Sequence, residues 1–346
     1  MYLFKSKRIN IFLITIFTIT ALCYCIYLYL GSYNRFLNFL KNNPEKYSIY
    51  SSINDNVFQK HNTEKQFYLA STKKIILLIE LSNQIDEKLI NEDMNVSTKV
   101  LDKLYLKGLD GGAHENWKKS LIESNINIKD SISLNNVANG MIEFSSNACT
   151  DYILNLLTIE KVNKCTLQFG VNKPNDFLYF SSLILTDSTK LKDNNYSDLK
   201  IENEKIYNKL LLNKYNIEKV PMSLRFQEIL LKRTEKASTG DYYKILSQIY
   251  TNEHKYKFVK DHLNWILKKK DNQKYFTYYG GKGGSLLGVY TYSCFAINKE
   301  NEKININFFI NEMDYLDWFL YQDSFLKFVK NYCKSKTERI NIVSKI

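Results

Sequence analysis

Three short segments of the chain combine hydroxyl, amine and amide side chains that together suit nucleophilic chemistry by a serine. They are Ser71–Lys74, Ser145–Asn147 and Lys282–Gly284, in that order along the sequence. A serine activated by a neighbouring base can attack a carbonyl carbon and form a covalent intermediate. Serine, lysine and asparagine are abundant here, so only the surroundings of each segment can show that it belongs to a site.

Ser71 and Lys74 stand at the start of an apolar segment, residues 71–82, that leaves almost no polar face and therefore predicts a helix buried on all sides. Residues three apart share a helix face. Desolvation and the positive end of the helix dipole favour a neutral lysine, which can accept the proton of a hydroxyl group. We predict Ser71 as nucleophile and Lys74 as base or proton relay; the alternative is a helix cap beside a lysine that reaches solvent.

The same S-x-x-K spacing recurs at Ser197 and at Ser324, each followed three residues later by a lysine. Neither of these serines begins an all-apolar helix. The context therefore favours Ser71.

Ser145 and Asn147 fall between two predicted helical segments, residues 131–144 and 148–159. A loop at such a break can direct a hydroxyl and an amide into a cleft. We predict that Ser145 passes a proton to the leaving group and that Asn147 holds a substrate amide and orients Lys74. The alternative is that these residues cap the following helix.

Lys282 opens a K-x-G segment that we place at the start of a strand. Gly284 permits a substrate to approach the backbone closely, and Lys282 can attract a substrate carboxylate. The amide of Ser285 can pair with that of Ser71 as an oxyanion hole. A plain glycine-rich turn is the alternative.

Strand patterns occur at both ends of the chain and helical patterns between them. Residues 47–53 and 57–60 predict a hairpin, and residues 304–310 alternate so that Ile304, Ile306, Phe308 and Ile310 share one buried face. Further strands are expected at 275–279 and 286–297, and an aromatic helix at 313–332. This order predicts an α+β fold, in which an antiparallel sheet from both chain ends packs against helices around a mostly helical middle subdomain, about residues 85–265.

The N-terminal sequence predicts a membrane anchor. Residues 1–10 form a basic tail and residues 11–30 an uncharged apolar run of the length that crosses a bilayer. We expect a cytoplasmic N-terminus, a connector at 31–46 and an extracytoplasmic domain at 47–340. A cleaved signal peptide is the rival interpretation, and lipidation at Cys23 is a further alternative.

The cysteines, the histidines and the net charge limit the kinds of site and ligand that we expect. The four cysteines outside the anchor are scattered and are predicted to be small buried apolar residues, and the four histidines lack metal-ligand spacing, so we expect no metal and no cofactor. The net charge of +12 fits anionic lipid headgroups or acidic wall polymers rather than nucleic acid. The oligomeric state is not predicted.

In their order and local context, residues 68–74, residues 141–147 and the Lys282 strand resemble the penicillin-recognising serine enzymes, particularly the class A β-lactamases, over about residues 45–335. The resemblance implies a five-stranded sheet, a nucleophile at Ser71 and proton transfer by Lys74 and Ser145. It implies substrate binding by Asn147, Lys282, Gly284 and Ser285.

Three features depart from the family pattern. Ser146 replaces the aspartate of S-D-N, Gly283 replaces the hydroxyl residue of K-[ST]-G, for which Ser285 is a candidate substitute, and no E-x-x-L-N segment supplies a deacylating glutamate. We therefore expect a membrane-anchored serine hydrolase or acyltransferase acting on a β-lactam or a peptidoglycan-type substrate. The alternative is a catalytically impaired relative that acts as a cell-wall or protein binding module.

Overall fold

The computed structural model describes residue 20 and residues 29–171, 177–186, 196–213, 224–252 and 254–346. The predicted tail and most of the predicted anchor, residues 11–30, lie outside this part of the chain. Among the residues described, no helix has both the length and the apolar character needed to traverse a bilayer.

Five antiparallel strands from both chain ends form the main sheet, in the order β2-β1-β9-β8-β7. Their bounds are β1 Tyr47–Ile53, β2 Asn56–His61, β7 Phe276–Leu286, β8 Val289–Asn298 and β9 Lys303–Ile310. This arrangement confirms the predicted fold class and the N-terminal hairpin. Short strands pair elsewhere: β3 (Phe67–Tyr68) with β6 (Lys236–Ala237), and β4 (Asn95–Ser97) with β5 (Ser131–Ser133).

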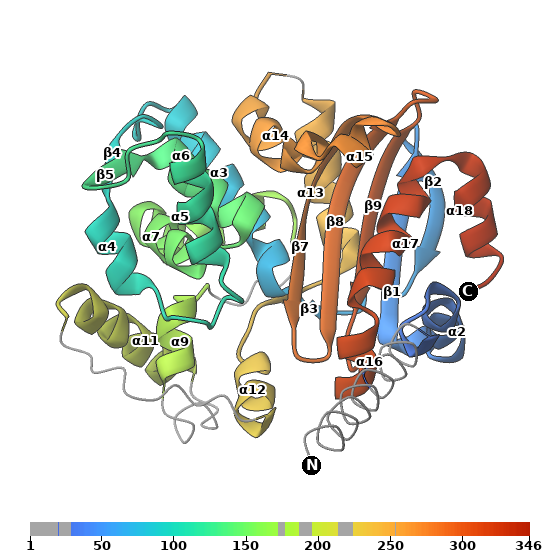
Figure 1. Ribbon diagram of the computed structural model, residues 1–346, viewed down its shortest axis with the longest axis horizontal. Coiled ribbons are helices and arrows are strands. Elements are labelled where there is room, and N and C mark those ends of the chain that lie inside the picture. The colour runs from blue at the N-terminus through green and yellow to red at the C-terminus, as the bar shows by residue number, and fades with distance from the viewer. Residues whose placement is uncertain (1–19, 21–28, 172–176, 187–195, 214–223, 253) are drawn as a thin grey trace, which may run out of the picture.

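Both faces of this sheet are covered. Ile304, Ile306 and Phe308 belong to one core with helices α2 (Tyr33–Asn42) and α17 (Gln322–Lys334), as the alternation in β9 predicted. Phe309 faces the other way and packs against Tyr242 of α13 (Thr239–Thr251). Figure 1 shows α17 lying across the sheet and a helical lobe beside it.

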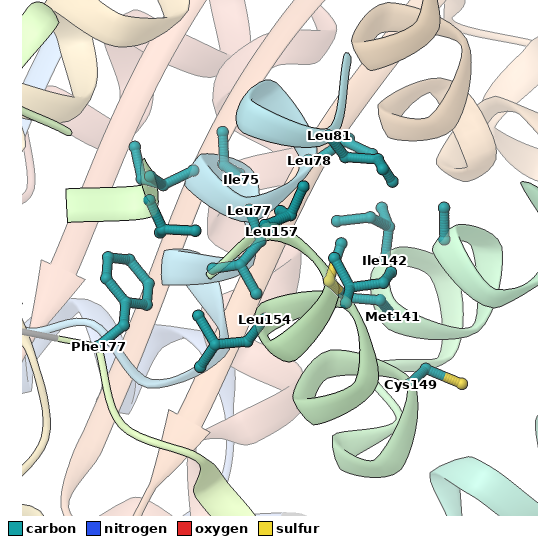
Figure 2. Packing of buried hydrophobic residues seen from close by; sticks show 14 of the residues in the cluster. Ile75, Leu77, Leu78, Leu81, Met141, Ile142, Cys149, Leu154, Leu157 and Phe177 are labelled. Carbon is teal, nitrogen blue, oxygen red and sulfur yellow. The ribbon is translucent and has the colours of Figure 1, made fainter. Parts of the chain in front are cut away.

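Helix α3 (Lys74–Asp86) forms the centre of the helical lobe. Its apolar residues Ile75, Leu77 and Leu78 have no exposed surface and lie among side chains of neighbouring helices (Figure 2). Helix α3 contacts η3 Gly140–Phe144, α7 Asn147–Leu157, α8 Ile159–Gln168 and α14 Lys257–Leu263. The other helices of the middle segment are α4 Thr98–Leu104, α5 Ala113–Glu123, α6 Leu134–Asn139, α9 Phe180–Leu185, α11 Tyr196–Leu211 and α12 Leu224–Leu231. Burial of residues 74–82 makes this part of α3 a rigid base for the residues at its N-terminus.

Several boundaries differ from the predictions. Residues 31–46, predicted as a connector, form part of the folded domain, because α2 buries Phe36 and Leu40 in the sheet core. Lys282 lies inside β7 rather than at its start, since the glycines around it continue the ladder with β8. The C-terminal aromatic helix is divided into α16 (Tyr315–Leu320) and α17, followed by α18 (Lys336–Val343). The middle segment is not one unit either, because α13 packs on the sheet.

Candidate active site

Ser71 lies in a 3-10 turn, η2 (Ala70–Lys73), that leads directly into α3. Two buried threonines hold this turn against the sheet: Thr72 Oγ1 lies 2.7 Å from Thr291 Oγ1, and Thr291 Oγ1 donates to the Leu69 carbonyl at 2.8 Å. Ala70 has a φ of 47°, a left-handed conformation that costs energy for a residue with a Cβ. Ser71 is thus presented by a strained turn that is fixed on both sides.

Ser145 is presented by a second strained position, between η3 and α7. Its φ of 70° lies in the left-handed region. Ser146 is the N-cap of α7 and accepts a hydrogen bond from the Cys149 amide. The predicted helix cap therefore exists at Ser146, and it leaves Ser145 and Asn147 on either side of it directed toward Lys74.

A hydrogen-bonded chain joins Ser71 to two lysines through Ser145. The Ser145 hydroxyl donates to Ser71 Oγ at 2.9 Å and accepts from Lys74 Nζ at 3.1 Å and from Lys282 Nζ at 3.2 Å. Lys74 Nζ also donates to the Ser145 carbonyl at 2.7 Å and to Asn147 Oδ1 at 3.2 Å. Ser71, Lys74, Ser145, Asn147 and Lys282, all predicted from sequence, therefore meet at one point.

Burial shifts the protonation of both lysines toward the neutral form. The pKa of Lys74 is well below its ordinary value because the amine is desolvated and because the charges of Lys282 and Lys73 lie nearby. Desolvation lowers the pKa of Lys282 to about 7. Each amine can therefore lose its proton under mild conditions, which a proton acceptor for a serine hydroxyl requires.

His114 of α5 contacts this loop at Ser146, the position where the S-D-N pattern has a carboxylate. Its Nδ1 lies 2.9 Å from Ser146 Oγ, and its Nε2 lies 3.5 Å from Asp102 Oδ1. Since a carboxylate only accepts, Nε2 carries the proton and Nδ1 accepts from the Ser146 hydroxyl. Burial lowers the pKa of His114, which keeps the ring neutral. Sequence reasoning missed this residue, because nothing in the spacing connects it with Ser146.

Strand β7 passes close to the nucleophile, and its close contacts explain the glycines at positions 283 and 284. A Cβ on Gly284 would lie 2.5 Å from the Ser71 nitrogen, and a Cβ on Gly283 would lie 2.8 Å from a ring carbon of Tyr292. Tyr292 therefore fills the space next to position 283. Ser285 Oγ accepts from Trp318 Nε1 at 3.2 Å, so its hydroxyl is engaged with α16.

These residues line one pocket with a volume of about 540 Å³. Of the predicted site residues, Ser71, Lys74, Ser145, Asn147, Lys282, Gly284 and Ser285 all lie on its wall. No pattern in the sequence indicated a second group of lining residues, which come from loops, strands and helices far apart in the chain: Leu109, Asp110, Thr150, Phe180, Tyr290, Tyr292, Trp318, Gln322, Phe325 and Leu326.

The model of the beta-lactamase enzyme family matches residues 32–284, more than half of the chain. The chain belongs to this family. No curated protein sequence matches it.

Several solved structures share the fold. A beta-lactamase from Sphaerobacter thermophilus is 13% identical, with a TM-score of 0.53 over 89% of this chain and 95% of the other. A class A beta-lactamase from Bacteroides cellulosilyticus is 13% identical, with a TM-score of 0.52 over 86% and 99%. A mutant of PBP-A, solved as an acyl-enzyme complex with penicillin G, is 14% identical, with a TM-score of 0.51 over 86% and 96%. The family resemblance and the fold predicted from sequence are thus confirmed.

Carboxylates near the site of this beta-lactamase family member serve the fold. Asp110, the only acidic residue among the described residues that line the pocket, accepts from the amides of Ala113 and His114. Asp151 is fully buried and accepts from two amides at the start of α9. Glu235 pairs with Lys73 at 2.7 Å.

None of the glutamates in the helical insert, Glu202, Glu204 and Glu228, lines the pocket. Among the described residues, the one carboxylate on the pocket wall is therefore Asp110, and both of its oxygens accept backbone amides.

Proposed function

We propose that this protein is a serine acyl-transfer enzyme that forms a long-lived acyl-enzyme on Ser71 with a β-lactam or a cell-wall peptide-type substrate. The hydrogen-bonded chain from Ser71 through Ser145 to Lys74 is the observation that carries the proposal. Membership of the beta-lactamase family and its fold support hydrolase chemistry.

In the proposed reaction, the hydroxyl hydrogen of Ser145 rotates from Ser71 toward Lys74 once that amine is neutral. Ser71 Oγ then attacks the carbonyl carbon as its proton passes to Ser145, while the proton of Ser145 passes to Lys74. Return of that proton through Ser145 to the leaving group breaks the bond to it and leaves the acyl group on Ser71. The amides of Ser71 and Ser285 stabilise the oxyanion. Asn147 positions the substrate, and Lys282 attracts its carboxylate.

Release of the acyl group is proposed to be slow, because Asp110, Asp151 and Glu235 are committed to structural bonds. After a brief exposure to benzylpenicillin and removal of the free drug, intact-mass spectrometry is expected to show a persistent adduct. Fast turnover of nitrocefin without any accumulating adduct would refute slow release. A complete lack of both adduct and turnover would instead favour a non-catalytic binding module.

The pH dependence of acylation should differ between charged and neutral substrates. Acylation of any substrate is expected to rise with pH as Lys74 loses its proton, because its pKa is lowered by burial and by neighbouring positive charge. For a penicillin, which carries a carboxylate, the rate constant should fall again above about pH 7 as Lys282 loses its charge. A neutral p-nitrophenyl ester should lack this alkaline decline; an equal decline for both substrates would exclude Lys282 as the carboxylate-binding cation.

We further propose that residues 11–30 anchor the enzyme with its N-terminus in the cytoplasm and its site outside. The support is the sequence pattern of a basic tail before a long apolar run. The full chain expressed in bacteria should sediment with membranes and resist extraction by alkaline carbonate, and a chain lacking residues 1–30 should be released. Recovery of the full chain in the soluble fraction would refute the proposal that residues 11–30 anchor it in the membrane.

A further inference from the structure

The pocket continues past Ser71 and β7 into a second region, which we call the aromatic lobe. Its lining residues come from the end of β7, from β8 and from helices α16 and α17, and none of them carries a charge: Ser285, Leu286, Tyr290, Tyr292, Trp318, Gln322, Phe325 and Leu326. The charged side chains on the pocket wall are Lys73, Lys74, Asp110 and Lys282, and of these only Lys282 comes from an element that also lines the lobe, further back along β7. The two ends of one pocket therefore differ in chemistry.

Aromatic rings form the wall of this lobe. Tyr290 stacks on Phe325 with ring centroids 5.1 Å apart and lies beside Trp318 at 6.2 Å. Tyr292 meets Phe325 edge to face at 6.5 Å. Rings in mutual contact hold each other in place, so this wall is largely formed before any ligand arrives.

The polar tips of two of these side chains are already engaged within the protein. The Tyr290 hydroxyl donates to the Trp318 carbonyl, and Trp318 Nε1 donates to Ser285 Oγ. These groups are therefore committed to the protein, and the lobe is walled mainly by ring carbon. Such a surface favours an apolar group over a carboxylate or a phosphate.

Glycine at position 283 lets the Tyr292 ring pack directly against β7. Because a Cβ there would lie 2.8 Å from that ring, a larger residue would displace it. Leu326, which is 46% exposed, marks the outer rim. Ser71 and the residues of the lobe line the same pocket, so the lobe is continuous with the site of the nucleophile.

We propose that the aromatic lobe binds an apolar arm, an aromatic ring or an acyl chain, of the substrate that reacts with Ser71. This inference rests on the proposed function, because the occupant is defined by its attachment to the reacting carbonyl. Because Ser71 and the lobe residues line one pocket, a group attached to the reacting carbonyl can extend into the lobe. The substrate class is therefore an amphiphilic amide or ester, polar near Lys282 and apolar beyond β7.

Straight-chain alkylboronic acids test whether the lobe binds an apolar arm. Their boron adds reversibly to a serine hydroxyl, and the alkyl chain on the boron serves as the arm. The dissociation constants of the butyl to octyl compounds are measured with the full-length chain. Each methylene group buried in the lobe should lower the constant about three- to fourfold. Trp318→Ala and Leu326→Glu should flatten this trend, and Leu89→Ala, at an exposed leucine away from the pocket, should retain it.

The possible outcomes distinguish a failure of the lobe proposal from a failure of the proposed acylation of Ser71. Two results would refute binding of the arm in the lobe and leave the acyl-enzyme proposal intact. One is a dissociation constant that does not depend on chain length; the other is a dependence on chain length that persists in both lobe variants. A chain that binds no boronic acid and forms no penicillin adduct would overturn the proposed function itself. Ser71→Ala, measured in parallel, reports any binding of the arms that does not depend on the nucleophile.

Discussion

Replacing Lys74 with methionine is expected to lower the rate constant of acylation by about 10²- to 10⁴-fold, the usual contribution of a positioned proton acceptor. Methionine keeps the apolar stem of this buried side chain, which is 2% exposed, and removes only the amine. Ser145 then loses the partner that receives its proton. Stopped-flow measurement with a chromogenic cephalosporin gives the rate constant.

Lys270→Met is the matched control, because this lysine is exposed and lies outside the pocket. It should acylate like the parent protein. Thermal unfolding and circular dichroism establish that both variants are folded. A Lys74→Met protein that is folded and retains more than a tenth of the parental rate constant would show that Lys74 is not the acceptor.

Replacing Gly284 with alanine is expected to lower acylation by about 10²- to 10³-fold, the range seen when one oxyanion-hole donor is lost. The new Cβ would lie 2.5 Å from the Ser71 nitrogen and 2.8 Å from the Leu69 carbonyl oxygen. Both are backbone atoms of a turn that Thr72 and Thr291 hold in place, so the strand itself must move. Displacing β7 carries the Ser285 amide away from the oxyanion.

Gly280→Ala on the same strand is the control. Its Cβ would meet the far end of the Tyr278 side chain, which can move more easily than backbone. This variant should lose some stability and retain most of its rate constant per folded molecule. Equal losses of acylation in the two variants would indicate a general effect on the strand rather than a close approach at Ser71.

The residues that meet at the candidate site were predictable from the sequence, because each lies in a recognisable local pattern. Ser71 precedes an all-apolar helix, Ser145 lies at a break between helices, and Lys282 lies among glycines. The alternation of Ile304 to Ile310 likewise predicted one buried face of β9. The position of Lys282 within its strand was misjudged, because the run of glycines resembles a turn in sequence while the ladder to β8 continues through it.

The rest of the site depends on long-range packing that leaves no local trace. His114 reaches Ser146 from another helix, and the spacing of the two residues says nothing about that contact. Tyr292 occupies space beside Gly283 only because β7 and β8 pair in one particular register. Trp318 and Phe325 line the pocket because α16 and α17 pack near the strands, whereas their sequence indicated only an aromatic helix.

Peptide mapping after labelling with a fluorescent penicillin tests the central claim most directly. Digestion of the labelled full-length chain and tandem mass spectrometry should locate the adduct on Ser71, and Ser71→Ala should remain unlabelled while folding like the parent protein. A label on another residue, or undiminished labelling of folded Ser71→Ala, would contradict the account.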